Sequence, residues 1–380
     1  MHQELSHFAA RLRAMISSGQ PAFDDHQFAE LAVELFALQF QCNPVYRRIC
    51  EAKQQTPAAI REWTDIPAVP TGSFKELELT SIPVVEQTAM FHSSGTTGQQ
   101  PSRHFHSAES LALHETSLWH WFRPHFRAHN NLLFLTPEGA AVPHSSLVHM
   151  FETVAQADSS VNRGAFCGRV EDDGAWTLDF DRVVQRLQSA VTHRRPLTVL
   201  GTAFSFVHLL DYCEVNGLRF PLPTGSQVME TGGYKNRSRV LPKAELHALI
   251  TRCLGVGRAD IICEYGMSEL SSQAYDSTVE PPSPTRLETD ELQPTESETG
   301  ALANRHFHFP PWARAQVISP ETGRSVSVGE LGLIRIFDLA NVFSVAAVQT
   351  ENLGIRWSDG YELIGRAGQA EPRGCSLMSA

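Results

Sequence analysis

The residues best suited to chemistry form a Ser/Thr/Gly string, Ser93-Ser94-Gly95-Thr96-Thr97-Gly98. Its two glycines permit backbone conformations that other residues rarely adopt. Successive N–H groups in such a loop form a nest for an anion, and the four hydroxyls add further donors. The G-x-x-x-x-G-K-[ST] pattern of a Walker A loop does not occur. The string therefore predicts a triphosphate-binding loop of another kind, whereas a shorter Ser-Gly-Thr would indicate only a turn.

Two further strings come later in the chain in a fixed order. One is Glu230-Thr231-Gly232-Gly233-Tyr234-Lys235, and the other is Glu264-Tyr265-Gly266-Met267-Ser268-Glu269, directly after the apolar run 260–263. Together with the first string they resemble the adenylate-forming superfamily, which includes acyl-CoA synthetases and luciferases. The resemblance implies bound ATP and Mg²⁺, with Glu269 holding the metal ion and Ser268 contacting the α-phosphate. It also implies that the adenine is lined by Thr231, Gly232, Gly233, Tyr265 and Gly266.

Nearly the whole chain is similar to one branch of that superfamily, the LuxE-type long-chain acyl-protein synthetases. The stretches that carry this similarity are Asn43–Tyr46, Pro70–Lys75, Phe309–Trp312, Asp338–Asn341, Gln349–Gly354 and Gly365–Ala367, followed by Glu371–Leu377. The last of them contains Cys375, which this branch would use to accept the acyl group as a thioester. Gly374 gives the thiol flexibility and Arg373 favours the thiolate. An inert tail cysteine is the alternative.

The sequence departs from the superfamily pattern at several positions. Asn352 stands where an acidic residue would grip the ribose, with Glu351 or Asp359 as substitutes. Arg103 replaces the lysine that usually follows the phosphate loop. Arg366 occupies the hinge position, after which only a short tail follows instead of a domain with a catalytic lysine. We therefore expect Lys235 or Arg103 to contact the leaving phosphates.

The resemblance implies that the protein activates a long-chain fatty acid as acyl-AMP and transfers the acyl group to its own Cys375. An acyl-protein reductase or an acyl carrier would then receive it. One alternative is an acyl- or aryl-CoA ligase similar to phenylacetate-CoA ligase, in which Cys375 is idle. The other is a non-catalytic subunit that binds nucleotide or acyl groups for a partner.

The elements that must position these residues indicate an α/β fold. Residues 1–55 have helical periodicity that breaks at Asn43-Pro44. Short apolar runs at 131–135, 197–200 and 260–263 alternate with helical patterns at 183–191 and 204–214, which is typical of a mainly parallel sheet with flanking helices. Residues 277–300 read as an exposed loop, and residues 329–365 as strands. We expect an adenylate-forming domain over 1–355 and a vestigial C-terminal segment over 356–380.

Composition excludes several other classes. The formal net charge of −11 disfavours nucleic acid as a partner. No apolar run approaches the ~20 residues of a membrane-spanning helix, and no secretory leader is recognisable. Seven scattered cysteines without a C-x-x-C pair are typical of a reducing compartment, so we expect a cytoplasmic protein.

The histidines offer weaker signals. His104 with His106, and His306 with His308, put paired imidazoles on one face of a strand, but ordinary surface histidines are the better interpretation. His144 occupies the place where the superfamily gates its acyl pocket.

Overall fold

The structure is a computed structural model that describes residues 2–19, 23–93, 100–127, 131–157, 165–233, 238–276 and 305–367. The predicted exposed loop at 277–300 lies outside these ranges, as does the tail after residue 367. Within the described ranges, no helix combines the length and hydropathy needed to cross a bilayer.

Three helices open the chain, α1 (His2–Ser18), α2 (Asp25–Cys42) and α3 (Pro44–Ala52). Their ends follow from local chemistry. The Asp24 side chain accepts the N–H of Gln27 and caps α2, while Asn43 accepts the N–H of Tyr46 and caps α3. Pro44 takes the first position of α3, where its missing N–H costs nothing. The predicted break at Asn43-Pro44 is confirmed.

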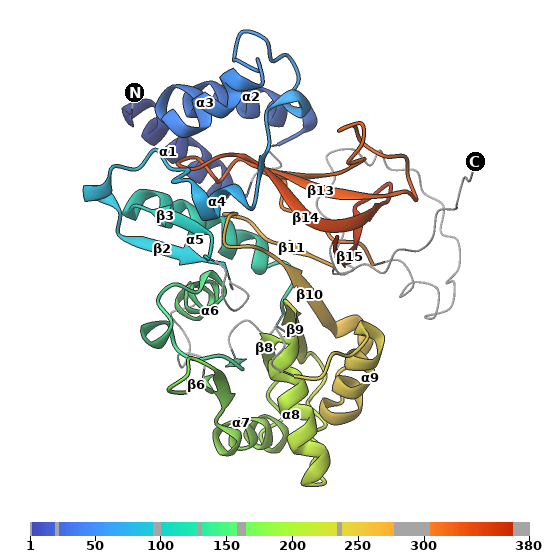
Figure 1. Ribbon diagram of the computed structural model, residues 1–380. Coiled ribbons are helices and arrows are strands. Elements are labelled where there is room, and N and C mark those ends of the chain that lie inside the picture. Colours follow the sequence, from blue (N-terminus) through green and yellow to red (C-terminus); the bar gives the residue numbers. More distant parts are fainter. Residues whose placement is uncertain are drawn as a thin grey trace.

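A six-stranded sheet lies mainly in the lower half of the molecule in Figure 1. Its strand order is β11-β10-β9-β8-β4-β5, and every neighbouring pair is parallel except β10–β11. All residues of β8, β9 and β10 are buried, as expected for parallel strands covered on both faces. The bounds are β4 (Leu132–Phe134), β5 (Ala165–Phe166), β8 (Thr198–Thr202), β9 (Gln227–Thr231), β10 (Ile261–Tyr265) and β11 (Ala274–Tyr275). The three strands predicted from the apolar runs are confirmed.

Helices cover both faces of this sheet. Leu133, Val228 and Ile261 pack in one hydrophobic cluster with α7 (Phe180–Thr192), α8 (Ala203–Val215) and α9 (Lys243–Leu254). Their strand neighbours Phe134, Met229 and Ile262 pack in a second cluster with α5 (Ala108–Phe122) and α6 (Ser146–Ala157). Successive residues of one strand therefore face different layers, and this alternation decides which side chains can meet.

A second sheet has the order β1-β14-β13-β12, with β15 paired to β14. Its strands run antiparallel, apart from the parallel pair β1–β14. The predicted mainly parallel arrangement therefore applies to the six-stranded sheet, whereas short connections between β13, β14 and β15 make the second sheet antiparallel. The predicted division after residue 355 stays a prediction. The bounds are β1 (Val69–Pro70), β12 (Ala313–Ile318), β13 (Leu331–Asp338), β14 (Ala347–Arg356) and β15 (Tyr361–Arg366).

The remaining elements are small. Two antiparallel hairpins, β2–β3 and β6–β7, stand outside the two large sheets. The first of them leads into and out of the Ser/Thr/Gly string. The bounds are α4 (Ser73–Glu76), β2 (Ala89–His92), β3 (Arg103–His106), β6 (Gly168–Val170) and β7 (Trp176–Leu178). Single turns of 3₁₀-helix occur at Trp63–Asp65, Val84–Glu86, Gly139–Ala141 and Arg258–Asp260.

Candidate active site

The predicted site residues that the structure describes gather where the carboxyl ends of β9 and β10 approach the β2–β3 hairpin and the second sheet. In Figure 1, β10 and β11 extend from the lower half towards β14 and β15. Backbone bridges between Tyr275 and His308 and between Phe307 and Tyr361 join the two sheets at this place. Ligands of parallel sheets bind beyond the carboxyl ends of the strands, and this edge therefore has the expected position.

Glu269 is the centre of a buried hydroxyl–carboxylate cluster. Ser102 Oγ donates to Glu269 Oε1 at 2.6 Å, and Ser268 Oγ donates to Oε2 at 3.2 Å. The two hydroxyl oxygens lie 3.4 Å apart, and the Glu269 residue is only 5% exposed. One carboxylate and two hydroxyls form an all-oxygen donor set, which is the kind that Mg²⁺ prefers.

The same serine connects this cluster to Ser93, the first residue of the predicted phosphate loop. Ser102 N–H donates to Ser93 Oγ at 3.0 Å, and Ser93 N–H donates to the Ser102 carbonyl oxygen at 3.3 Å. The structure therefore brings Ser93, Ser268 and Glu269 together through Ser102. Ser102 belongs to none of the sequence motifs, although its place shortly after the loop is a usable signal. The loop residues Ser94, Gly95, Thr96, Thr97 and Gly98 lie outside the described ranges.

The segment that carries Ser268 and Glu269 is held from the second sheet by Asn341. Its Nδ2 donates to the Glu269 carbonyl oxygen at 2.8 Å, and its Oδ1 accepts from Ser271 Oγ at 2.7 Å. Asp338 accepts from Ser271 N–H at 2.9 Å and from Ser272 Oγ at 2.8 Å. Burial raises the pKa of Asp338 to about 6, although these hydrogen bonds act to lower it. Both residues position the segment, and the motif search assigned neither of them a role at the site.

Tyr265 forms the other side of the candidate site. Its ring meets the rings of Phe307, Phe309 and Tyr361 edge-on, with centroids 6.1, 6.3 and 6.1 Å away. Its hydroxyl lies 3.4 Å from Asn352 Oδ1 of β14. Burial raises the pKa of Tyr265, so the hydroxyl remains a neutral donor.

Arg366 lies on the same side of the candidate site as Tyr265, because it stands opposite Asn352 in the β14–β15 register. Its positive charge acts to lower the pKa of Tyr265. Asp359 and Glu351, the acidic residues predicted to substitute for Asn352 at the ribose, have other surroundings. Asp359 pairs with His306 through Nδ1 at 2.8 Å, and its side chain is 63% exposed. Glu351 is exposed on β14.

The glycine-rich turn after β9 begins at Thr231, whose hydroxyl donates to the Glu264 carboxyl group. Gly232 has a φ of +70°, a conformation that L-residues rarely adopt. At Gly266, a Cβ would lie 2.3 Å from Glu264 Oε1, so a side chain there would displace this carboxyl group. Burial raises the pKa of Glu264 to about 7, while the Thr231 hydroxyl lowers it and Glu230 raises it. Glu264 opens the Glu264–Glu269 string, but the string assigned no role to its carboxyl group.

Arg103 and Lys235 were expected to contact the leaving phosphates, and the structure describes the first of them. Arg103 is described, and its Nη1 lies 3.2 Å from Glu78 Oε1 while its guanidinium packs over Phe105. Its charge is therefore already shared with an exposed carboxylate. Lys235 lies outside the described ranges, as does Cys375.

The expectation that His104 and His106 are surface residues is wrong. They are 4% and 1% exposed, their rings pack against each other, and the His106 ring also packs against His114, which is 3% exposed. The error arose because β3 is covered on both sides, which a polar sequence does not suggest. Burial lowers the pKa of His104 to about 4, although its hydrogen bond to the Ser268 carbonyl oxygen acts to raise it.

The other predicted histidines are also placed by ring packing. His306, at 9% exposure, is buried too, and its ring stacks on Trp357. His144 stacks on His92 with ring centroids 4.5 Å apart, and its Nδ1 lies 2.9 Å from the Met90 carbonyl oxygen. His144 therefore stands beside the strand that leads into the predicted phosphate loop.

Comparison with known proteins agrees with this geometry. No family model matches the sequence. The chain is similar to the long-chain-fatty-acid–luciferin-component ligase of Aliivibrio fischeri, with 23% identity over 368 residues that cover 92% of this chain and 87% of that protein. The ligase of the same name from Vibrio harveyi is 22% identical over 352 residues, which cover 90% and 84% of the two chains. The predicted resemblance to LuxE-type proteins is confirmed.

Solved structures match at the level of the fold. The structure of 2-hydroxyisobutyryl-CoA ligase in complex with 2-HIB-AMP and CoA has a TM-score of 0.64 and 15% identity. The match covers 91% of this chain and 69% of that one. A second structure of this ligase, in the postadenylation state, has a TM-score of 0.64, 16% identity and coverage of 92% and 69%. The predicted α/β fold is confirmed, and it is shared with this CoA ligase.

Proposed function

We propose that this protein is a ligase that activates a long-chain fatty acid with ATP and transfers the acyl group to its own Cys375. The observation that carries the proposal is the buried cluster of Ser102, Ser268 and Glu269, because it ties the phosphate loop to the segment after β10. The similarity to two luciferin-component ligases along nine-tenths of the chain supports the fatty-acid substrate.

In the first step, the fatty-acid carboxylate attacks the α-phosphorus of ATP. The new bond joins the carboxylate oxygen to that phosphorus, and pyrophosphate leaves with the electron pair of the broken P–O bond. Tyr265 packs along the adenine, Asn352 and Arg366 bind the ribose, and the Ser268 hydroxyl donates to the α-phosphate. Glu269 would hold Mg²⁺, which would offset the negative charge of the phosphates. Preorganised donors lower the barrier because the two reactants repel each other.

In the second step, the Cys375 thiolate attacks the acyl carbonyl carbon. A C–S bond forms, the bond between the acyl carbon and the phosphate oxygen breaks, and AMP leaves. The thiol proton goes to solvent. A thioester of this kind is a substrate for reduction to an aldehyde, so a reductase or an acyl carrier is the partner that fits the product.

Intact mass measurement tests both steps. The full chain is incubated with Mg-ATP and a series of fatty acids, and its mass is taken before and after hydroxylamine treatment. We expect an acyl adduct that hydroxylamine removes and that is absent in Cys375→Ser, while Cys42→Ser, which changes a half-buried thiol on α2, retains it. AMP release that requires CoA, without an adduct, would instead identify a CoA ligase. No AMP formation with any acid would leave a binding subunit.

A further inference from the structure

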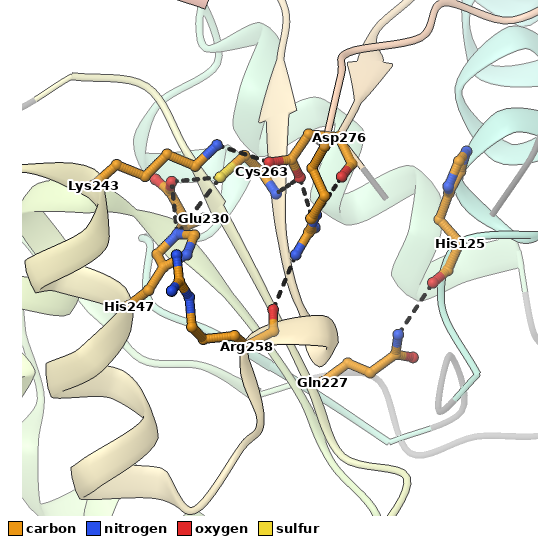
Figure 2. Close-up of polar contacts among 9 residues, drawn as sticks. His125, Gln227, Glu230, Lys243, His247, Arg258, Cys263 and Asp276 are labelled. Atoms are coloured by element: carbon orange, nitrogen blue, oxygen red, sulfur yellow. Dashed lines mark hydrogen bonds and ion pairs between the residues drawn. The ribbon is translucent and has the colours of Figure 1, made fainter. Parts of the chain in front are cut away.

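A second polar cluster lies on the opposite side of β9 and β10 from Thr231 and Glu264. Glu230 on β9, His247 on α9 and Cys263 on β10 point towards one another (Figure 2). One ligand atom from each residue lies within 4.8 Å of the other two. The three residues are 8%, 4% and 4% exposed, so the cluster is closed to bulk solvent.

The local fold explains why these residues meet. In the parallel register of β9 and β10, Glu230 stands directly beside Cys263. Their side chains share the face that carries Val228 and Ile261, which pack against α9. His247 is buried on α9, the helix that covers this face. Three elements of the core therefore supply one ligand atom each.

The separations of the ligand atoms match a tetrahedral metal site. His247 Nε2 lies 3.4 Å from Glu230 Oε1 and 3.6 Å from Cys263 Sγ. Nitrogen and oxygen atoms at ~2.0 Å and sulfur at ~2.3 Å from a tetrahedral Zn²⁺ are about 3.3–3.6 Å apart. The third separation, from Cys263 Sγ to Glu230 Oε1, is 2.8 Å and widens by less than about 1 Å to admit an ion.

The electrostatics of two neighbouring carboxylates differ in a way that favours a cation at Glu230. Asp276 forms ion pairs with two cations, because Lys243 Nζ lies 2.7 Å and Arg305 Nη2 lies 2.8 Å from its oxygens. Within the described ranges, the groups in contact with the Glu230 carboxylate are the Cys263 thiol and the His247 imidazole. The Lys243 ammonium group also acts on the Cys263 thiol, but it is paired with Asp276. A buried carboxylate without its own cation is costly, and a divalent ion at this point would supply one to Glu230.

The surroundings also fix the orientation of the sulfur ligand. Asp276 Oδ1 accepts the backbone N–H of Cys263 at 2.7 Å, and Figure 2 shows both residues beside Lys243. Lys243 stands four residues before His247 on the same helix, and its ammonium group is tied to Asp276. Outer groups that hold metal ligands in place are a regular part of metal sites.

We propose that Glu230, His247 and Cys263 bind one Zn²⁺, with water in the fourth position. Mixed sulfur, nitrogen and oxygen donors suit Zn²⁺, whereas Mg²⁺ prefers oxygen alone. On binding, the S–H bond of Cys263 breaks, a Zn–S bond forms and the proton goes to solvent. The ion clamps α9 to β9 and β10, one residue before Thr231 and two residues before Tyr265. It therefore stiffens the strand ends that carry the candidate nucleotide site.

Cobalt substitution tests this site with a readout that is independent of catalysis. The full chain, freed of any affinity tag, is stripped with a chelator and titrated with Co²⁺. We expect about one ion per chain, with the visible spectrum of a four-coordinate ion and a sulfur-to-cobalt charge-transfer band. Zn²⁺ should displace the Co²⁺ and abolish both signals.

Substitutions identify the ligands. Cys263→Ser should remove the charge-transfer band, and Glu230→Gln should keep the band while weakening Co²⁺ binding by about 100-fold. The matched control is Cys253→Ser. It changes a different buried thiol, which lies on α9, and should leave both signals intact. A wild-type protein that binds Co²⁺ without the sulfur band overturns the proposal. So does a band that survives in Cys263→Ser. If that variant does not fold, the wild-type spectrum and Glu230→Gln still decide the matter.

Discussion

The two faces of the strand pair β9–β10 carry different chemistry on adjacent residues. On one face, the Thr231 hydroxyl donates to the Glu264 carboxyl group, whose pKa burial raises to about 7. On the other face, Glu230 and Cys263 meet His247 under α9. The first face adjoins the segment with Tyr265 and Glu269, and the second is closed by a helix. One strand pair can thus hold a substrate site and a metal site without mixing them, because side chains alternate.

Glu269→Gln should distinguish the two faces most clearly, because it should change catalysis without changing the α9 face. It removes the charge from the cluster with Ser102 and Ser268, so fatty-acid-dependent formation of acyl-AMP should fall by about 100- to 1,000-fold. The Co²⁺ signals at the α9 face should remain unchanged. A rate assay and a Co²⁺ titration on the same preparation check both statements. More than a tenth of the wild-type rate would contradict the role given to this carboxylate.

Asn341→Leu should lower the stability of the protein on the same face, around Glu269. The substitution leaves the Glu269 carbonyl oxygen and the Ser271 hydroxyl without their partner in a buried position, since Asn341 is 1% exposed. The free energy of unfolding should fall by about 2–4 kcal/mol. Urea unfolding measures it. The matched control is Asn216→Leu at the exposed end of α8, which should cost about 1 kcal/mol or less.

Glu269 and Asn341 show which site residues can be predicted from a sequence and which cannot. Tyr265, Ser268 and Glu269 were predictable because they form one local motif beside a strand. Asn341 and Ser102 reach Glu269 across 72 and 167 residues, so their contacts depend on how the two sheets and the hairpin pack. Short motifs therefore identify groups that touch a ligand better than groups that hold those residues in place.

The strands and helices were largely predictable for a similar reason. The apolar runs at 131–135, 197–200 and 260–263 carry their own periodicity, whereas the burial of His104 and His106 depends on what covers β3. The α9 cluster was equally hidden, because His247 lies 17 residues from Glu230 and 16 from Cys263. Only the register of β9 and β10 places the three residues together.

Stability should depend on pH through the buried histidines beside Ser268. Burial lowers the pKa of His104 to about 4, so the unfolded chain takes up its proton first as pH falls below about 6.5. Stability from this group is complete above pH ~6.5 and is lost towards pH ~4, with a loss of roughly 2 kcal/mol between pH 7 and pH 5.

Asp338 acts in the opposite direction. Its pKa is raised to about 6, so its contribution is present below pH ~4 and is lost as pH rises through about 6. Urea unfolding at several pH values checks the balance. His104→Gln, which can still donate to the Ser268 carbonyl oxygen, should flatten the histidine-dependent part of the profile. An unchanged profile would contradict a neutral buried His104.

Tyr265→Leu should have the smallest effect of this series. Loss of the aromatic surface should raise the KM for ATP by about 3- to 10-fold with little change in kcat, since ring packing contributes about 0.5–1.5 kcal/mol. Tyr265→Phe keeps the ring and removes only the 3.4 Å contact with Asn352, so its KM should stay closer to that of the wild type. Equal effects of the two substitutions would place the adenine elsewhere.

Formation of the proposed acyl adenylate is a reversible step. The most direct measurement is therefore the exchange of labelled pyrophosphate into ATP, with and without fatty acids of increasing chain length. We expect exchange that requires both Mg²⁺ and a fatty acid and that is strongest with a long chain. If ATP gains no label with any fatty acid, adenylate formation is contradicted and the chain only binds its ligands.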